Sequence, residues 1–263
     1  MELEKRKTQK KSPLLKEKPL RIAGQSLDEE MNRIVENFQF NWAVITGLVV
    51  ILALWEWVRW FNMFPPTPVF MTIIAAGAIL LAGWKYSRLF VRIRPLKLGR
   101  DGERQVGEQL EKLRQKGFHV FHDIVGENFN VDHVLIGPSG VLSIETKTIS
   151  KPINRDARVT YSDKQLKVDG YVLERDPIAQ SCAGASWIKH ILAESTGKEF
   201  RVRPVVLFPG WFVERMPWEL LAKVWVLTPK AFPKFLENEQ SLLSAEDVSL
   251  ASYHLSRHIR GSS

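Results

Sequence analysis

The stretch 131–149 constrains the fold of this 263-residue chain more than any other part of it. Two runs rich in Val, Ile and Leu are separated there by Gly-Pro-Ser-Gly at positions 137–140. Gly and Pro mark a turn, and apolar runs on both sides of such a turn are typical of an antiparallel hairpin. With these four residues as the loop, Ile136 faces Val141, and the register of every residue farther out follows from that pair.

This register brings three charged side chains to one face of the predicted hairpin. Asp132 falls opposite Glu145, and directly opposed residues in a sheet have Cβ atoms about 4.5–5.5 Å apart. Lys147 lies two residues beyond Glu145, so it shares that face about 6–7 Å along the strand. Facing carboxylates repel each other unless a cation lies between them. Mg²⁺ binds one or two carboxylates and keeps several waters, and an ammonium group beside it can orient a water. The pattern therefore predicts a phosphodiester-cleaving metal centre.

A simpler interpretation must be weighed, because Glu-x-Lys is common on solvated strands. Both faces of this hairpin are apolar, however, with these residues on the two faces: Val134, Ile136 and Val141; Leu135, Leu142 and Ile144. A strand that is covered on both sides is a poor place for charges without a role. The surroundings thus favour the functional interpretation.

Three motifs carry a resemblance to a known family: GERQVGEQL at 102–110, VDHVLIGPSGVLSIETK at 131–147 and PIAQ at 177–180. They closely resemble the nuclease-related domain (NERD) family of the PD-(D/E)XK nuclease superfamily, over about residues 99–230. The resemblance implies an α/β fold with a restriction-endonuclease-like core, which is a central mixed β-sheet flanked by helices. It also implies a nuclease that depends on Mg²⁺ or Mn²⁺ and acts on nucleic acid, with DNA as the first expectation.

The resemblance implies a role for each matched residue of the hairpin. Asp132, Glu145 and the backbone carbonyl of Thr146 would hold the metal. Lys147 would position or activate the attacking water. Every hairpin position that the motif requires is present in this sequence.

Two further residues match the family motif, although periodicity alone leaves their roles open. Glu103 lies on the apolar stripe of a helix predicted over 102–116. It either has a partner there, which would be a metal or Lys147, or is simply an acid in a first turn that the helix dipole stabilises. Gln180 lies on the inward face of a helix that Asp176-Pro177 should begin. It is either an ordinary core-edge amide or, as the resemblance implies, the glutamine that aligns the catalytic lysine or the substrate.

The formal net charge of +8 suits an anionic partner, either nucleic acid or an acidic lipid surface. The single cysteine, Cys182, excludes an internal disulfide and a cysteine-rich zinc site. No base-reading motif is visible, so the sequence does not choose a recognition sequence.

The N-terminal part of the chain predicts a membrane anchor. Residues 1–39 read as a basic tail and a short amphipathic helix with a capping box at Ser26. Two apolar stretches within 40–92 are each near the ~20 residues that cross a bilayer. Basic flanks then place both termini and the nuclease domain in the cytoplasm, as a multi-pass protein of a plasma or bacterial inner membrane, with contacts to anionic lipid. Glu56 and Arg59 should pair locally, and the alternative is a buried helical hairpin.

The remaining chain divides into a nuclease-like domain at 99–236 and a C-terminal helix at 237–263. Its order is a helix, three strands, a helix and two strands, which predicts a mixed sheet with helices on both sides. A polar hairpin over 156–173 is predicted to add to that sheet.

Two other functions stay open at this point. The same fold can hold nucleic acid at the membrane without cutting it, which salt-sensitive binding without turnover would reveal. It can also act as a membrane-associated scaffold. Opposed carboxylates argue against the scaffold, because protein contacts give no physical reason for Asp132 and Glu145 to face each other.

Overall fold

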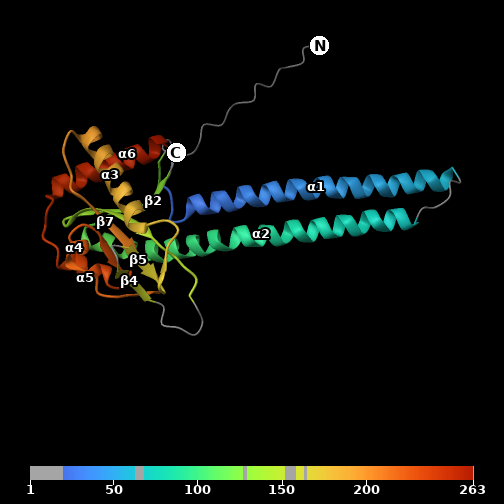
Figure 1. Ribbon diagram of the computed structural model, residues 1–263. Helices are drawn as coiled ribbons and strands as arrows, with labels where there is room; N and C mark the ends of the chain where they lie inside the picture. Colours follow the sequence, from blue (N-terminus) through green and yellow to red (C-terminus); the bar gives the residue numbers. More distant parts are fainter. Residues whose placement is uncertain (1–19, 63–67, 127–128, 152–157, 163–164, 263) are drawn as a thin grey trace, which may run out of the picture.

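The computed structural model describes residues 20–62, 68–126, 129–151, 158–162 and 165–262. A domain of strands and helices lies at one end, and an arm of two long helices extends from it (Figure 1).

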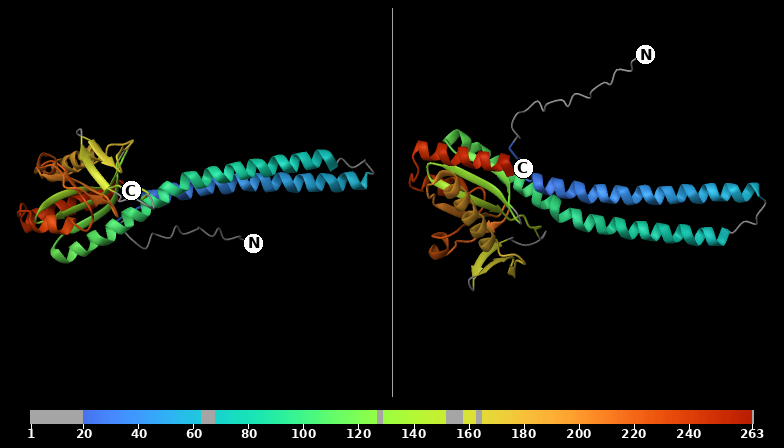
Figure 2. Two further views of the ribbon diagram at one scale, coloured as in Figure 1. Left: turned by 60° about the horizontal axis from the view of Figure 1, so that its bottom comes forward. Right: turned by 90° about the horizontal axis from the view of Figure 1, so that it is seen from above.

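The arm consists of α1 (Gln25–Phe61) and α2 (Pro68–Glu111). The two helices run side by side in every view (Figure 2). Helix α2 is continuous through Pro95 and ends inside the domain, followed by the 3₁₀ helix η1 (Lys112–Lys116). The helix predicted over 102–116 is therefore the end of a longer one. A proline lacks only its own N–H, and here the helix continues on both sides of that lost donor.

The arm exposes many large apolar side chains, among them Leu54, Trp60, Leu80 and Val91. Aromatic contacts join its two helices near the domain, where the rings of Phe38 and Tyr86 lie 6.0 Å apart.

Charged side chains lie inside both of the predicted membrane spans. Glu56 and Arg59 pair at 3.3 Å in the first, as expected, and Lys85 and Arg88 are exposed in the second. Charged groups are costly within a bilayer. Among the residues whose placement is described, no helix offers a run that is long and apolar enough to cross a membrane. The prediction of two spans within 40–92 is therefore wrong, together with the multi-pass localisation and the cytoplasmic orientation derived from it.

The first turn of α1 is capped by a distant residue. Its N-cap Gly24 has φ 71° and makes no side-chain cap, so the capping box predicted at Ser26 is wrong. Ser26 instead lies within the first turn, and its backbone N–H and hydroxyl donate to the Asp123 carboxylate at 2.8 and 2.6 Å. Most of the predicted basic tail, residues 1–19, lies outside the described residues.

The main sheet has five strands in the order β1-β2-β3-β7-β9. They are β1 (His119–Val125), β2 (Asn130–Gly137), β3 (Gly140–Thr146), β7 (Val202–Leu207) and β9 (Trp225–Leu227). The first three strands pair antiparallel, whereas β3, β7 and β9 pair parallel. This confirms the prediction of an α/β protein with a mixed sheet flanked by helices.

Helices cover both faces of this sheet. Helix α3 (Pro177–Thr196) and helix α6 (Ala245–Ser262) lie on one face, where Ile188 and Leu192 pack with Val134 (Figure 1). The other face is covered by the end of α2, η1 and α5 (Phe232–Glu237), with residues including Val106, Leu110, Leu135 and Leu142 in its core. Each such side chain, when fully buried, contributes about 1.5–3 kcal/mol.

The polar hairpin does not extend the main sheet, contrary to the prediction. It forms a separate sheet, which consists of β6 (Tyr171–Val172), β5 (Gln165–Val168), β4 (Arg158–Ser162) and β8 (Phe212–Val213). Strand β4 pairs with β5 on one side and with the short strand β8, just before α4 (Trp218–Leu221), on the other. Val159 of β4 packs with Phe208 and Trp211. No pattern in the sequence marks a strand as short as β8.

Candidate active site at the open end of the hairpin

The β2–β3 hairpin has a closed end at its turn and an open end where its strands separate. The register runs from Gly137↔Gly140 through Ile136↔Val141, as predicted, to His133↔Ile144. The next residue on each strand is Asp132 on β2 and Glu145 on β3. The two acids therefore stand where regular pairing stops.

The Asp132 carboxylate lies against the backbone of β3. Its Oδ2 accepts a hydrogen bond of 2.6 Å from the N–H of Thr146. The next N–H, that of Lys147, donates instead to the carbonyl of Leu207 on β7 at 2.9 Å. Because the backbone groups of successive strand residues point to opposite sides, the carbonyl of Thr146 points to the same side as Asp132.

Glu145 and Lys147 form an ion pair, with Nζ and Oε1 2.7 Å apart. Their side chains are only 13% and 22% exposed. They share the face of β3 that carries Ser143, and Ser143 lies against Gly184 of α3. The lysine thus reaches the acids from the same strand and the same face.

Glu103 comes to this place from α2. The preceding residue, Gly102, lies so close to Thr148 that a Cβ there would be 1.7 Å from the threonine Oγ1. Only a glycine permits that approach, and it brings the helix against the chain just beyond β3.

Two carboxyl groups of this site have raised pKa values. Burial, followed by the charges of Asp123 and Glu145, raises the pKa of Glu103 to about 8. Burial, followed by Glu145 and Glu103, raises the pKa of Asp132 well above its usual range. Lys147 opposes both shifts without cancelling them. The site is thus rich in carboxyl groups and short of cations.

The donor atoms present fit a hard divalent cation. Asp132, Glu145 and the Thr146 carbonyl offer only oxygen, which Mg²⁺ and Mn²⁺ prefer, whereas zinc sites favour nitrogen and sulfur. Within the described parts of the chain, no three His, Cys, Asp or Glu side chains form a group that could hold a metal ion. Mg²⁺ commonly binds only a few protein oxygens, and waters or phosphate complete its coordination shell. Two carboxylates and one carbonyl fit that pattern.

Gln180 lies in the first turn of α3, which begins as predicted. The Asp176 carboxylate accepts from the N–H of Ile178 at 2.9 Å, and Pro177 is the first helical residue. The side-chain Oε1 of Gln180 is buried and has no hydrogen-bond partner among the described residues. An unsatisfied buried acceptor costs about 1–3 kcal/mol, so this oxygen is free to accept from a donor that enters the site.

His133 lies apart from this cluster, in the core of the sheet. It is fully buried, and its Nδ1 lies 2.8 Å from Nδ1 of His122. Nε2 of His122 in turn lies 2.9 Å from Glu111. Burial lowers the pKa values of both histidines, which keeps them neutral.

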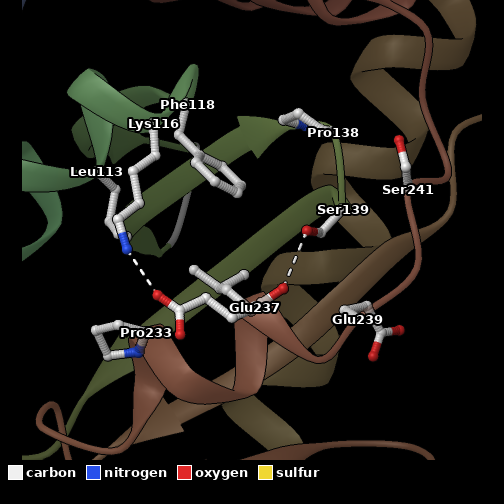
Figure 3. Close-up of a pocket in the computed structure, with 10 residues that line it drawn as sticks. Leu113, Lys116, Phe118, Pro138, Ser139, Pro233, Glu237, Glu239 and Ser241 are labelled. Atoms are coloured by element: carbon white, nitrogen blue, oxygen red, sulfur yellow. Dashed lines mark hydrogen bonds and ion pairs between the residues drawn. The ribbon is translucent and has the colours of Figure 1, made fainter.

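A cavity of about 230 Å³ lies at the closed end of the hairpin (Figure 3). Pro138 and Ser139 of the turn border it, and Lys116 pairs with Glu237 across it at 2.7 Å. None of the predicted site residues lines this cavity. The carboxyl cluster therefore lies elsewhere on the hairpin.

Asp123 of β1 is the residue that sequence reasoning missed. Its carboxylate is buried, acts on Glu103 and caps α1. The partners of this aspartate come from nearly a hundred positions earlier in the chain, so no local pattern marks it.

One family model matches the chain, over residues 98–209, and its description is "Nuclease-related domain" (NERD). The matched segment begins near the end of α2, finishes just beyond β7 and contains every predicted site residue. No curated protein and no solved structure matches the chain.

Proposed function

From the nuclease-related domain at residues 98–209, we propose that this protein is a divalent-metal-dependent nuclease with a restriction-endonuclease-like core. The observation that supports this most is the cluster of Glu103, Asp132 and Glu145 with a single lysine at the open end of the hairpin. A group of like charges that raise one another's pKa values is costly for the fold, and such clusters are typical of functional sites. The net charge of +8 agrees with nucleic acid as the substrate, and we propose DNA.

Each side chain has a definite task in this proposal. Asp132, Glu145 and the Thr146 carbonyl hold Mg²⁺ or Mn²⁺, which when bound supplies Lewis acidity and lowers the pKa of a bound water. The N–H of Thr146 fixes one oxygen of Asp132 and so orients the other. The Lys147 ammonium, held beside Glu145, positions the attacking water or stabilises charge on a phosphoryl oxygen.

Glu103 and Gln180 support these groups. With Lys147 as the nearby cation, the Glu103 carboxyl keeps its proton up to about pH 8. A bound divalent cation would favour its ionised form, which would support that ion or Lys147. The buried oxygen of Gln180 accepts from the lysine ammonium or from the substrate.

The test is a cleavage assay on the full-length protein. Labelled single- and double-stranded DNAs and RNAs are incubated with Mg²⁺, Mn²⁺ or a chelator. We expect cleavage of DNA with either metal, none with the chelator, and a loss of at least about a hundredfold in Asp132→Asn. Asp247→Asn, on the surface of α6, is the matched control and should cleave as the wild type does.

Two results would contradict the proposal. Salt-sensitive binding of nucleic acid with no turnover in either metal would identify a binding module instead. Undiminished cleavage by Asp132→Asn would place the chemistry at another site.

A further inference from the structure

The first turn of α1 is fastened to the domain through one carboxylate. Asp123 accepts from Nε of Arg21 at 2.8 Å and from the N–H and hydroxyl of Ser26 at 2.8 and 2.6 Å. The side chains of Arg21 and Asp123 are only 11% and 3% exposed. Asn130 of β2 adds a hydrogen bond of 2.8 Å to the Ser26 hydroxyl. This is a buried contact between segments about a hundred residues apart, and it holds residues 21–26 in place.

Asp123 makes this contact from a conformation that few residues adopt. Its φ is 51°, in the left-handed region, which Asp tolerates better than most side chains. The pairs on either side, His122↔His133 and Ile124↔Val131, place Asp123 across from Asp132. A strained residue inside a strand persists where the surroundings fix it, and such positions cluster at functional sites.

The fastened segment lies on the turns of α2 on either side of Glu103. Gly24, within this segment, has a φ of 71°, which glycine adopts without strain. A Cβ on Gly24 would approach Cγ of Arg100 to 2.9 Å, and a Cβ on Gly107 would approach Ala23 to 2.8 Å. The segment therefore touches α2 one turn before Glu103 and one turn after it.

We infer that Asp123 is a positioning residue of the active site, which holds Arg21 and Ser26 so that residues 22–26 stay packed on the turns of α2 that carry Glu103. The inference rests on the proposed function. It adds to the site a segment, residues 21–26, that lies outside the matched range 98–209. It also explains why a buried acid in strained backbone faces the start of the arm.

The first test needs no enzymatic activity. Hydrogen exchange of the full-length protein, resolved to single amides, should show at least tenfold faster exchange at residues 22–26 in Asp123→Asn. Glu103→Ala keeps every contact of Asp123 and should leave exchange at Ser26 unchanged. Glu239→Gln weakens another half-buried ion pair, with Arg203 at 2.6 Å, and should leave these amides unchanged. Unchanged exchange at residues 22–26 in Asp123→Asn would overturn the inference.

The second test separates positioning from a merely structural role. Asp123→Asn should lower the rate at saturating DNA about tenfold, with KM within twofold of the wild type. The same substitution in a Glu103→Ala background should have no further effect, because Asp123 acts through Glu103. Equal losses in both backgrounds would overturn the inference. If Asp123→Asn fails to fold, Ser26→Ala removes one of the same hydrogen bonds and should show a smaller loss with the same dependence on Glu103.

The two tests distinguish failure of the inference from failure of the proposed function. A wild type that does not cleave contradicts the proposed function, while the exchange measurement still decides whether Asp123 holds residues 22–26 on α2. If the wild type cleaves, and Asp123→Asn cleaves at the same rate but exchanges faster at Gly24, only the positioning role is contradicted.

Discussion

The two ends of the β2–β3 hairpin each carry a lysine–glutamate contact of 2.7 Å, but in opposite surroundings. At the closed end, the side chains of Lys116 and Glu237 are both more than half exposed. At the open end, Lys147 and Glu145 are mostly buried beside two further carboxyl groups, Asp132 and Glu103, whose pKa values are raised. The contact distance is the same, so it does not distinguish a surface ion pair from a site. The local balance of charge does.

This difference has a physical consequence for stability. An exposed pair gains little because water screens it, and it costs little to lose. A buried group of acids with a single cation destabilises the fold, so its presence needs a compensating function. If the two ends are treated as a matched pair, substitutions at each should have different consequences.

The lysines should differ most in cleavage. Lys147→Ala should lower the rate of DNA hydrolysis at least about a hundredfold, because it removes the group that orients water or stabilises charge on the phosphate. Lys116→Ala, at the same contact distance, should stay within twofold of the wild type. Steady-state assays on the full-length variants measure both rates. Similar losses in the two variants would remove the distinction between the ends.

The acids should differ in how stability depends on pH. The pKa of Glu103 is raised from 4.5 to about 8, so the folded state holds a proton that the unfolded state has lost, and stability falls as pH rises through that window. Glu103→Gln removes this loss. The difference in free energy of unfolding between Glu103→Gln and the wild type should therefore shift in favour of the variant as pH rises from 5 to 8. The expected shift is about 1–3 kcal/mol, after allowance for partial solvent screening.

Urea denaturation at several pH values measures this difference, and Glu237→Gln is the control. Lys116 lowers the pKa of Glu237, so its contribution is present above pH 4.5 and is lost only as pH falls below that value. The corresponding difference for Glu237→Gln should be flat between pH 5 and pH 8. A flat curve for Glu103→Gln as well would show that its carboxyl is not held in a repulsive environment.

Divalent cations should stabilise only the open end. Mg²⁺ at ten times its dissociation constant should raise the free energy of unfolding of the wild type by about 1.4 kcal/mol, which corresponds to a few degrees in Tm. Asp132→Asn should lose this increase, and Lys116→Ala should keep it. Thermal unfolding with and without Mg²⁺ measures it. An equal increase in Asp132→Asn would mean that the ion binds elsewhere.

The smallest effect should come from the closed end itself. Lys116→Ala should lower the free energy of unfolding only slightly, and a double-mutant cycle with Glu237→Gln should give a weak coupling, because water screens an exposed pair. A coupling as strong as that between Lys147 and Glu145 would show that exposure does not separate the two contacts.

Sequence reasoning worked where the signals are local. The turn Gly137–Gly140 sets the register of the hairpin, and strand alternation then brings Asp132 and Glu145 to the same end. The start of α3 follows from Asp176 and Pro177, which are adjacent in the chain. A cap or a tight turn depends on a few neighbouring residues, so a short stretch of sequence contains the whole cause.

It failed where the cause is distant. Ser26 begins a stretch with the sequence of a capping box, but its N–H and hydroxyl donate to a carboxylate from β1. No local sequence pattern predicts that partner. The separate small sheet includes β8, a strand of only two residues. It pairs with β4 in space but comes much later in the sequence. The place of Glu103 was expected from the family resemblance and not from periodicity, which left its role open.

The cap that Asp123 supplies to α1 also limits the order in which parts of the chain can fold. During synthesis from the N-terminus, both arm helices are made before β1, so their mutual contacts can form early. The first turn of α1 must wait, because Asp123 leaves the ribosome 97 residues after Ser26. Until then its leading amide groups are satisfied by water alone, and the start of the arm is the last part of it to become fixed.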